Sequence, residues 1–512
     1  MDDRRAGKLD PRKGKGGRLV MNRLVIIGGG IAGLSAAYYA IRNTKYDQIT
    51  LLESESRWGG KITTHRVPFD GGHFIIEGGP DTFLASKPWG VALCKELGLD
   101  KRLHGTNQNK KNTYVLNKGR LLPLPDGLAM MIPSDVPSIL RSRLISWFGK
   151  TRMGLDFLLP PHRINPEKTG AGGDESLGSF VSRRLGREAY ENLIEPLMSG
   201  IYAGDGDQLS LASTFPYLRD LELKHGSLAR SALKMRKQSN GKVQGSRSAF
   251  LTPTTGLAEI VEALVESLRL KGASLRLNTR VTSITRNLKR GAWNVTLDTE
   301  TLETDSLILA TPAYVSGTLL ASFAPELGST LQSIPYASTA TVSLAYRLSD
   351  IPHELDGYGY VIPRREGRKA LACTWTSTKF PHRAPEGYAL IRVFVGRAGQ
   401  ELPSPNGRGA GGEGELLEVA KKELELTLGI TAEPLVSRVF LWDKAMPQYN
   451  LGHPEILEQI DAGLEKYPTL ALAGNGYRGI GIPDCIHSGE LAIEKILNSM
   501  SLRATARSEA IS

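Results

Sequence analysis

The chain alternates between segments whose apolar residues are spaced for strands and segments whose apolar residues are spaced for helices. Residues 22–79 begin with the apolar run LVII, pass through a glycine-rich turn into the helical pattern AGLSAAYYAI, and reach a second apolar run, QITLLE. This order predicts strand, turn, helix and strand. Residues 88–250 instead carry apolar positions at helical spacing, as in SLGSFVSRRLGREAYENLIEPLM, so we expect a largely helical region there.

The second half of the chain returns to strand-like patterns. The helical pattern GLAEIVEALVESLRL precedes short apolar runs up to residue 312, and residues 334–396 alternate apolar and polar positions in ATVSLAY, GYGYVI, LACTWT and ALIRVFV. A helix and a strand follow over residues 416–440, and then come another glycine-rich motif and the closing helix SGELAIEKIL. Both ends of the chain have the pattern of a nucleotide-binding unit, and the middle does not. This predicts a discontinuous domain.

Composition and charge narrow the classes of function. A chain of 512 residues with 40% hydrophobic residues is expected to form two or three globular domains. Its formal net charge of +11 suits an anionic ligand or an anionic membrane surface. Basic residues are not interleaved with aromatic residues, which argues against nucleic acid. The nine histidines show no metal-binding spacing, and no GxSxG motif suggests a nucleophilic triad.

Three cysteines and one apolar stretch bear on the compartment. Cys94, Cys373 and Cys485 are odd in number and far apart, which argues against disulfides and for a reducing, cytoplasmic environment. Residues 24–41 are uncharged and imitate a membrane span, but they contain four glycines and change from a strand pattern to a helical one. We therefore expect a buried strand, turn and helix there. Any membrane contact, such as one with the inner face of the cell membrane, would be peripheral.

The first motif with a clear chemical meaning is a turn of the form GxGxxG, Gly28-Gly29-Gly30-Ile31-Ala32-Gly33. Its first glycine would permit the tight turn, the second would let a pyrophosphate approach the backbone, and the third would let helix and strand pack closely. The turn opens a helix, whose N-terminus favours an anion. Glu53 ends the second strand, where a carboxylate would accept hydrogen bonds from ribose hydroxyls. Together these features predict dinucleotide binding.

A second loop, RWGGKI, follows that acidic residue closely. It would let backbone groups and the basic residues Arg57 and Lys61, together with Gly60, meet the diphosphate and flavin a second time. Alone, this loop could be an ordinary basic surface loop, but its distance from Glu53 favours cofactor binding. NAD-binding domains rarely add such a loop, so it indicates FAD.

A third motif, GNGYRGIGIPDC over residues 474–485, follows the strand TLALAG and opens another helix. Its helix N-terminus would suit the ribityl and ring oxygens of a flavin. The alternative is a glycine-rich turn that merely closes the fold. We interpret Cys485 as a core residue and expect FAD to be held non-covalently.

Several blocks of the chain resemble the protoporphyrinogen/coproporphyrinogen oxidase family, and most of all its Gram-positive-type bacterial branch of FAD-dependent coproporphyrinogen III oxidases. They are GGGIAGLSAA, ESESRWGGKI, EGGPDTF, NLIEPLMSGIYAGD, ACTWTSTKFPHRAPEG, MPQYNLGH and GNGYRGIGIPDCI. The first and last blocks also resemble amine oxidases and carotenoid desaturases. The middle blocks do not, so they carry the family assignment. The resemblance covers residues 22–498 except for 402–414.

The resemblance implies a discontinuous Rossmann-like FAD-binding domain of α/β type within an α+β whole, a substrate domain with a mixed sheet, and a helical membrane-associating domain. The FAD-binding domain would comprise residues 22–87, 251–312 and 441–498, as the patterns above also suggest. Residues 88–250 would form the mainly helical region of the substrate channel, and residues 313–440 the substrate domain. Four segments are predicted to be tails or linkers: the basic tail 1–21, the glycine-rich and proline-rich segments 166–174 and 402–414, and the tail 499–512.

The resemblance also implies roles for individual residues. Carried over by position, the further FAD contacts would be Leu52, Gly79, Pro80, the backbone at Val281, Trp442, Gly474, Ile480, Gly481 and Ile482. The substrate cavity would be lined by Gly200, Ile201 and Ala203, and the tetrapyrrole flanked by Val342, Val361 and Trp375. Lys87 would bind a substrate propionate; its alternative is a solvated loop lysine.

The implied reaction is the removal of six electrons from coproporphyrinogen III in heme biosynthesis, with dioxygen as acceptor and hydrogen peroxide released. Protoporphyrinogen IX is the alternative substrate, and the net charge favours the more anionic copro form. A flavin amine oxidase, a carotenoid desaturase and a non-catalytic flavin or tetrapyrrole carrier rank lower. No side chain is assigned as a general acid or base. Transient contact with other heme-pathway enzymes is a further expectation.

Overall fold

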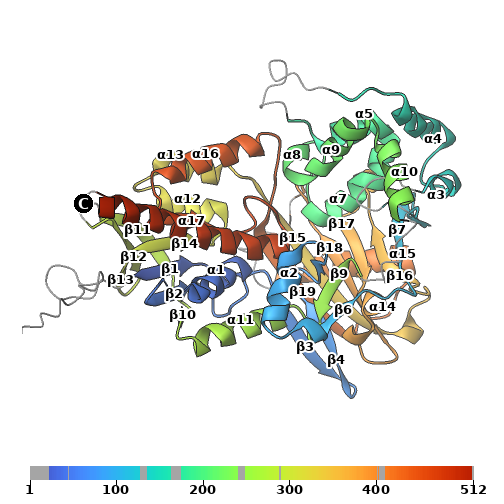
Figure 1. The fold of residues 1–512 in the computed structure, drawn as a ribbon. Coiled ribbons are helices and arrows are strands. Elements are labelled where there is room, and N and C mark those ends of the chain that lie inside the picture. Colours follow the sequence, from blue (N-terminus) through green and yellow to red (C-terminus); the bar gives the residue numbers. More distant parts are fainter. Residues whose placement is uncertain are drawn as a thin grey trace, which may run out of the picture.

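The computed structural model describes residues 22–43, 45–126, 128, 135–162, 174–239, 248–287, 290–400, 402 and 410–509. The predicted tail 1–21 and most of the predicted linkers 166–174 and 402–414 lie outside these ranges. The described chain forms three units that lie side by side (Figure 1). They are a lobe around a parallel sheet, a second lobe around a large mixed sheet, and a helical unit above the second lobe.

The parallel sheet confirms the predicted discontinuous α/β domain. Its strands run in the order β10-β2-β1-β14-β20, and every pair is parallel. Their apolar runs are buried because helices cover both faces of such a sheet. The bounds are β1 Arg23–Ile27, β2 Gln48–Leu52, β10 Ser274–Arg276, β14 Ser306–Leu309 and β20 Leu470–Leu472. The sheet thus joins strands from three distant parts of the chain.

Three helices share one apolar core with this sheet. They are α1 (Ile31–Arg42), α11 (Ala258–Leu270) and α17 (Ile482–Glu509). A Cβ atom at Gly489 would lie 2.4 Å from the carbonyl oxygen of Ala32, so α17 can cross α1 at this distance only with glycine at that position. The helix also corrects a prediction, because it continues through residue 509 where a tail was expected from residue 499. No glycine or proline interrupts it after residue 489.

The other face of the parallel sheet is covered by three helices and a small antiparallel sheet, of which only residues 313–332 were predicted to belong to another domain. Helices α12 (Ala313–Leu320), α13 (Pro325–Gln332) and α16 (His453–Glu465) pack there, beside the antiparallel strands β11 (Val281–Asn287), β12 (Ala292–Leu297) and β13 (Thr301–Thr304). The predicted boundary at residue 312 is therefore too early. Residues 313–332 belong to the first lobe because their apolar positions complete its core.

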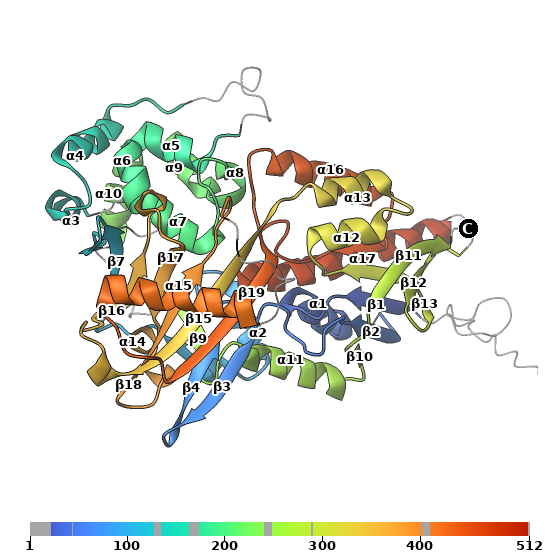
Figure 2. The same ribbon diagram turned by 180° about the vertical axis from the view of Figure 1, so that it is seen from behind.

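The second lobe is a seven-stranded mixed sheet in the order β19-β15-β18-β17-β16-β7-β8. Its bounds are β7 Asn112–Asn117, β8 Arg120–Pro123, β15 Tyr336–Arg347, β16 Gly357–Val361, β17 Ala370–Trp375, β18 Tyr388–Val395 and β19 Val436–Pro447. Two of these strands, β7 and β8, come from the region predicted to be mainly helical. One face of the sheet is covered by α15 (Ala410–Leu428), which begins inside the predicted linker 402–414 (Figure 2).

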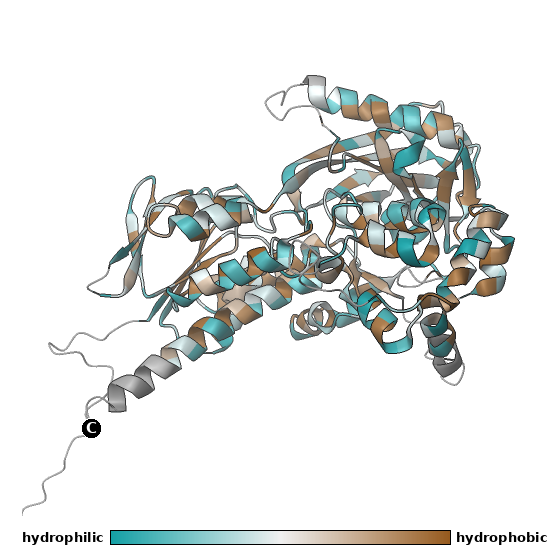
Figure 3. Cartoon of the chain, turned by 90° about the horizontal axis from the view of Figure 1, so that it is seen from above, coloured by the Kyte–Doolittle hydropathy of each residue, from teal (hydrophilic) through white to brown (hydrophobic). Residues whose placement is uncertain are grey.

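The helical unit contains α3 (Val136–Arg141), α4 (Trp147–Gly154), α5 (Leu177–Leu185), α6 (Arg187–Ala189), α7 (Glu195–Tyr202), α8 (Leu211–Thr214), α9 (Pro216–His225) and α10 (Leu228–Ser239). Serine side chains cap three of these helices by accepting backbone hydrogen bonds: Ser146 from Gly149, Ser176 from Ser179 and Ser210 from Ser213. Hydrophobic and hydrophilic residues alternate along the covering helices, as expected for amphipathic packing (Figure 3).

Shorter elements connect the lobes. They are the hairpin of β3 (Thr64–Phe69) and β4 (Gly72–Glu77), the small sheet of β5 (Phe83–Leu84), β9 (Phe250–Pro253) and β6 (Leu103–Gly105), and helix α2 (Pro88–Glu96). Helix α14 (Thr376–Lys379) packs on the second lobe, against β16, β17 and β18. None of the helices in the described part of the chain is both long enough and apolar enough to cross a bilayer.

Candidate functional site

The first glycine turn has the conformation that its sequence requires. Gly28 has a φ of +108°, and its N–H donates to the carbonyl of Leu52 at 2.8 Å, which ties the turn to the end of β2. A Cβ atom at Gly33 would lie 1.9 Å from the carbonyl oxygen of Gly28. At Gly30, in contrast, a Cβ atom would meet no heavy atom within 4 Å. The turn is therefore closely packed at Gly33 and open at Gly30.

The open position, Gly30, immediately precedes the first residue of α1. No side chain caps the first turn of α1, which also contains no acidic residue, so its first N–H groups are available to an anion. The carboxylate of Glu53 accepts hydrogen bonds from the N–H of Gly29 at 2.7 Å and from the N–H of Glu55 at 2.9 Å. Glu53 thus stands at the end of β2, beside the turn, as the motif predicts.

The second loop lies directly against the first turn. The N–H of Gly59 donates to the carbonyl of Gly29 at 2.8 Å, and Gly60 has a φ of +56°. The guanidinium of Arg57 is used inside the loop, where it donates to the carbonyls of Gly60 at 2.5 Å and Ile62 at 3.2 Å. Arg57 therefore shapes the loop, while the backbone at Gly60 lies beside Gly30.

Lys61 reaches from the second loop toward the C-terminal motif. Its ammonium group donates to the carbonyl of Ala445 and lies 3.5 Å from Oδ1 of Asn475. Burial lowers the pKa of Lys61 to about 8. The described residues place no carboxylate within ion-pair distance of it. A half-buried lysine of this kind fits a bound anion, which would favour its protonated form.

The third motif is held in place by a tyrosine. The hydroxyl of Tyr449 donates to the carbonyl of Asn475 at 2.7 Å and accepts from the N–H of Gly479 at 2.9 Å, and the ring of His453 stacks on it with centroids 4.2 Å apart. A Cβ atom at Gly474, which has a φ of +125°, would again meet no atom within 4 Å. Two residues of the MPQYNLGH block, Tyr449 and His453, thus support the turn that precedes α17.

The residues that begin α17 complete this motif. Gly481 donates its N–H to Asp484 at 3.2 Å, Ile482 is buried as the first residue of the helix, and Ile480 packs against the core of the helical unit. Cys485 is a buried free thiol whose pKa burial raises to about 12, which suits a core residue. Lys87 donates to both carboxylate oxygens of Asp484, at 2.6 and 2.7 Å.

Loop 78–81 joins the glycine motifs to the seven-stranded sheet. The carbonyl of Gly78 accepts from Nε1 of Trp442 and from Oγ1 of Thr341, each at 2.8 Å. A Cβ atom at Gly79 would lie 1.9 Å from the carbonyl oxygen of Lys61. Half-buried Pro80 follows. The loop therefore has to pass between the second glycine loop and the sheet.

Two ion pairs, one buried and one half-buried, fix this loop. The ammonium of Lys379 lies 3.1 Å from Asp81, and the guanidinium of Arg383 lies 2.7 Å from Glu77. Burial alone would raise the pKa of Asp81, but Lys379 and Arg392 outweigh it and lower the pKa to about 2. Val281, the remaining predicted contact, begins β11. The nearby Thr279 donates its N–H to the carbonyl of Glu53 at 2.8 Å.

We call residues 28–33, 57–62 and 474–482, together with Glu53, the cofactor cradle. They offer two open glycine positions, two helix N-termini, the carboxylate of Glu53 and the half-buried Lys61. This set fits a flavin dinucleotide.

Two of the predicted substrate residues are on the wrong face of the sheet. Val342 and Trp375 are fully buried in the core that the sheet shares with α15. They therefore line no accessible surface. The reason is the alternation of a β-strand, in which a shift of one residue turns a side chain to the opposite face. Thr341, the neighbour of Val342, points the other way and bonds to Gly78. We call its side the inner face.

The inner face carries residues that the sequence analysis did not select. Half-buried Val361, which was predicted, lies on it together with half-buried Thr374 and Phe394 and buried Arg392. Strand periodicity in LACTWT and ALIRVFV could have assigned these alternate positions to one face. It could not have said which face meets the cofactor cradle.

Helix α7 approaches the same face with its C-terminal end. Ala203 has a φ of +48°, is buried against Leu371 and Ala372, and accepts a hydrogen bond from the N–H of Ala398 at 2.7 Å. Gly200 and Ile201 are exposed, with 46% of the surface of Ile201 accessible. Ala203 thus meets the inner face, whereas Gly200 and Ile201 lie at the surface.

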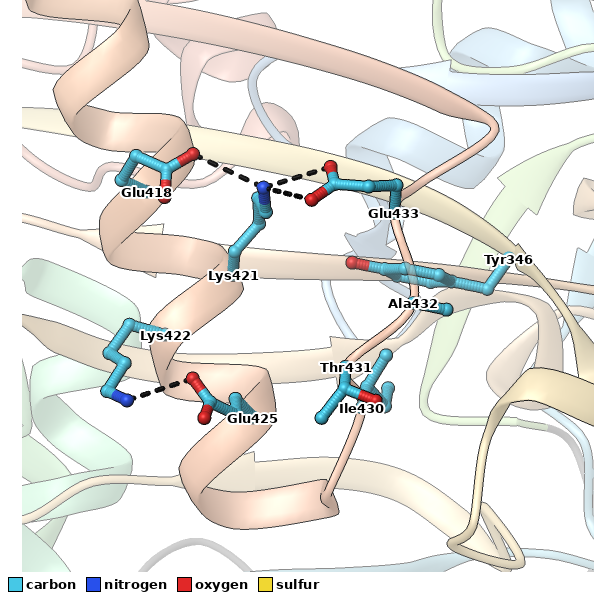
Figure 4. Close-up of a pocket in the computed structure, with 9 residues that line it drawn as sticks. All are labelled: Tyr346, Glu418, Lys421, Lys422, Glu425, Ile430, Thr431, Ala432 and Glu433. Atoms are coloured by element: carbon cyan, nitrogen blue, oxygen red, sulfur yellow. Dashed lines mark hydrogen bonds and ion pairs between the residues drawn. The ribbon is translucent and has the colours of Figure 1, made fainter.

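A pocket of about 300 Å³ lies elsewhere, on the α15 side of the sheet (Figure 4). It is lined by Tyr346, Glu418, Lys421, Lys422, Glu425, Ile430, Thr431, Ala432 and Glu433. Its charges pair with one another, as Lys421 does with Glu433 at 2.7 Å, and Lys422 with Glu425 at 2.9 Å. It shares no residue with the cofactor cradle or the inner face.

Comparisons with known proteins agree with this geometry. The sequence model of the family described as flavin containing amine oxidoreductase matches residues 31–497. The coproporphyrinogen III oxidase of Bacillus subtilis is 37% identical over 482 residues, which are 93% of this chain and 97% of that protein. The one from Staphylococcus aureus is 34% identical over 93% and 98% of the two chains. The protoporphyrinogen oxidase of Bos taurus is 31% identical over 93% and 98%.

Solved structures show the same relationship. A structure from Exiguobacterium, assigned as a protoporphyrinogen oxidase, superimposes with a TM-score of 0.78 at 34% identity and covers 93% of this chain and 98% of that one. Cyclohexylamine oxidase from Brevibacterium oxydans superimposes with a TM-score of 0.63 at 16% identity, over 94% of this chain and 100% of that one. This second likeness concerns the fold alone.

Proposed function

Since this chain belongs to the coproporphyrinogen and protoporphyrinogen oxidases within the flavin-containing amine oxidoreductases, we propose that it oxidises a porphyrinogen of heme biosynthesis with bound FAD. The observation that carries the proposal is that the chain is 37% and 34% identical to two coproporphyrinogen III oxidases over nearly their full length. The cradle and the inner face support it, because a dinucleotide bound in the cradle would lie beside a partly apolar surface.

Coproporphyrinogen III is the proposed substrate, and protoporphyrinogen IX is the alternative. The copro oxidases reach 37, 34 and 32% identity, whereas the proto oxidases reach 29–31%. The net charge of +11 also favours the substrate with four propionates over the one with two. Dioxygen is the proposed acceptor, with hydrogen peroxide as its product.

The residues of the chain have binding and positioning roles in this reaction. Bound FAD supplies hydride acceptance. The turns at Gly30 and Gly474, with the N-termini of α1 and α17, would hold its diphosphate and ribityl chain, and Glu53 would meet its ribose. Loop 78–81 and Trp442 would bring the cofactor to the sheet. The inner face would hold the porphyrinogen against it, because hydride transfer requires contact. We assign no side chain to proton transfer.

Lys87 is proposed to bind a propionate of the substrate. Its ammonium pairs with Asp484, but 41% of the lysine side chain is exposed, so the pair is open to solvent. Exposed ion pairs stabilise a fold by only about 0–1 kcal/mol. A substrate carboxylate could therefore compete for this lysine.

The test is aerobic turnover of both porphyrinogens by the purified holoenzyme, followed through porphyrin fluorescence and hydrogen peroxide. We expect a higher kcat/KM for coproporphyrinogen III than for protoporphyrinogen IX. Fluorescence that rises no faster than in the enzyme-free control, for both substrates, would refute the proposal. A higher kcat/KM for protoporphyrinogen IX would assign the chain to the alternative.

We also propose a peripheral membrane contact through a docking patch on the helical unit. The patch consists of six exposed apolar residues: Val136, Leu140, Trp147, Phe148, Leu155 and Leu158. Trp147 is 73% exposed and Phe148 81%, and the ammonium of Lys150 lies 4.5 Å from the centre of the Trp147 ring. Helices α3 and α4 stand at the outer edge of the molecule, far from the parallel sheet (Figure 1). Exposed aromatic residues beside basic ones are typical of contacts with an anionic bilayer surface.

Sedimentation with lipid vesicles tests this contact. We expect the protein to bind vesicles with anionic lipids, and W147S/F148S to lose most of that binding with turnover unchanged. L270S is the matched control, because Leu270 is 79% exposed on α11 of the other lobe. Equal binding by both variants would contradict the patch. Contact with other heme-pathway enzymes stays a prediction.

A further inference from the structure

Arg392 is a buried guanidinium at the middle of the inner face. It lies on β18, between Thr374 of β17 and Ser343 of β15, and only 2% of its surface is accessible. Its guanidinium carbon stands 4.6 Å from the centre of the Phe394 ring, two residues along the same strand. The residue is thus part of the wall that faces the cofactor cradle.

Its hydrogen bonds occupy only one of its three nitrogens. Nη2 donates to the carbonyls of Gly78, at 3.3 Å, and Gly79. Nε has no partner, and Nη1 makes no hydrogen bond to the described residues. No described carboxylate lies within 4.0 Å of it. Other buried arginines differ: Arg184 lies 2.5 Å from Asp156, and Arg383 lies 2.7 Å from Glu77.

The neighbouring carboxylates are already used. Glu77 pairs with Arg383, and Asp81 pairs with Lys379. With Arg392 there are three cations and two carboxylates, which leaves one positive charge without a partner in a mostly buried cluster. Buried charges are costly unless they are paired. The cluster therefore lacks an anion.

The surface next to Arg392 shows which kind of anion would fit. Val361, Thr374 and Phe394 are only half-buried although they lie on three neighbouring inner strands, so the space in front of them is accessible. Ala203 of α7 closes one side of it against Leu371 and Ala372. An apolar wall beside a guanidinium with a free Nη1 matches an apolar ring system that carries carboxylates on its rim.

We propose that Arg392 binds a carboxylate of the porphyrinogen through Nη1, and so fixes the orientation of the ring against the inner face. This inference rests on the proposed function and names the residue that recognises the substrate charge. It makes Arg392 a substrate-binding residue that acts in addition to Lys87.

Equilibrium binding of the reaction product to the holoenzyme tests the proposal without turnover. We expect R392Q to weaken the binding of coproporphyrin III roughly tenfold to a hundredfold, which is the range of a charge-assisted hydrogen bond. R392K should weaken this binding less. The tetramethyl ester of the same porphyrin, in the same detergent, should bind R392Q and wild type alike. R438Q is the matched control, because Arg438 is exposed and lies in the same cross-strand row on β19.

A second pair of variants does not remove the buried arginine. Thr374 lies directly opposite Arg392, so T374D would supply the missing carboxylate from within the protein, and T374N is its neutral control. We expect T374D to retain flavin, to melt at a higher temperature than T374N, and to lose coproporphyrin III binding. T374N should bind it within a fewfold of wild type.

The outcomes separate two failures. If wild type binds and oxidises porphyrin but R392Q, R392K and T374D bind coproporphyrin III as wild type does, Arg392 has no substrate role and only this inference is wrong. Equal losses for the acid and its ester would mean that the variants distort the wall, which also overturns it. If wild type neither binds nor oxidises any porphyrin, the proposed function fails, and the inference falls with it.

Discussion

The cofactor cradle is formed mainly by backbone groups, whereas the inner face of the seven-stranded sheet is formed by side chains. In the cradle, backbone groups of glycine turns would bind the cofactor, and each turn is specified by a few consecutive residues, such as Gly28 to Gly33. On the inner face, side chains would contact the substrate, and Val361, Thr374 and Phe394 come from three strands. A backbone site can therefore be recognised locally, whereas a side-chain site depends on pairing and register between distant segments.

The largest expected effect separates the two sides of one turn in the cradle. In G33V the new Cβ atom would lie within 1.9 Å of the Gly28 carbonyl, so we expect loss of the folded domain and of all flavin. In G30V the new side chain enters open space, so we expect a folded protein without flavin. Circular dichroism and the visible flavin spectrum measure both. Normal flavin content in G30V would remove this turn from the cofactor site.

The sequence predicted the cradle well because its motifs combine turn, strand and helix signals at fixed spacing. The order of elements around Gly28 and the position of Glu53 are those the structure shows. The domain boundaries were less predictable. Nothing in residues 313–332 distinguishes helices that cover the parallel sheet from helices of another domain. An amphipathic pattern shows that a helix has an apolar face, but not which surface this face packs against.

The next effect tests the register of the substrate wall. V342A should lower the free energy of unfolding by about 2 kcal/mol, because a buried valine loses contacts with the α15 core, and should leave KM unchanged. F394A should raise KM for coproporphyrinogen roughly tenfold, because a half-buried ring loses its contact with the substrate. Denaturant unfolding and steady-state kinetics measure the pair. The reverse pattern would mean that the substrate lies on the α15 side.

The positions of Val342 and Trp375 show that a resemblance carried over residue by residue does not establish which face of a strand a side chain lies on. Val342 and Trp375 were assigned from the alignment of similar blocks, and each is one residue away from an inner-face position, Thr341 and Thr374. A bulge between Ala370 and Ala372 shifts the pairing of β17 with β18. Such a bulge is set by tertiary contacts and leaves no clear mark in the sequence.

A smaller effect concerns Lys87, at the edge between the cradle and the substrate. K87A should raise KM for coproporphyrinogen about tenfold, since a charge-assisted hydrogen bond to a propionate is lost, with a smaller change in kcat. Flavin content should not change. Kinetics at low and high salt measure the contact, because its exposed side makes it sensitive to screening. Equal KM values in wild type and K87A would show that the lysine only pairs with Asp484.

The smallest effect is a pH dependence within the cradle. Without an anion, Lys61 loses its proton from about pH 8 upward, and a bound diphosphate favours the protonated form. FAD binding should therefore take up a proton above pH 8, and FAD affinity should fall with rising pH by at most about tenfold per unit. Gel filtration of the holoenzyme from pH 7 to 9.5 measures the flavin retained. In K61M the retained fraction should no longer change with pH, and an unchanged profile would contradict the role of Lys61.

The position of α17 has a consequence for how the enzyme is made. The first glycine turn lies near the start of the chain, yet its neighbour in the core is a helix that runs from residue 482 to residue 509. During translation the ribosome releases Gly28 long before Gly489, so α1 lacks the part of its apolar cover that α17 provides until that helix has been made. The newly made polypeptide therefore becomes competent to acquire its coenzyme only after α17 has been synthesised. A stop codon before residue 482 would leave a colourless chain.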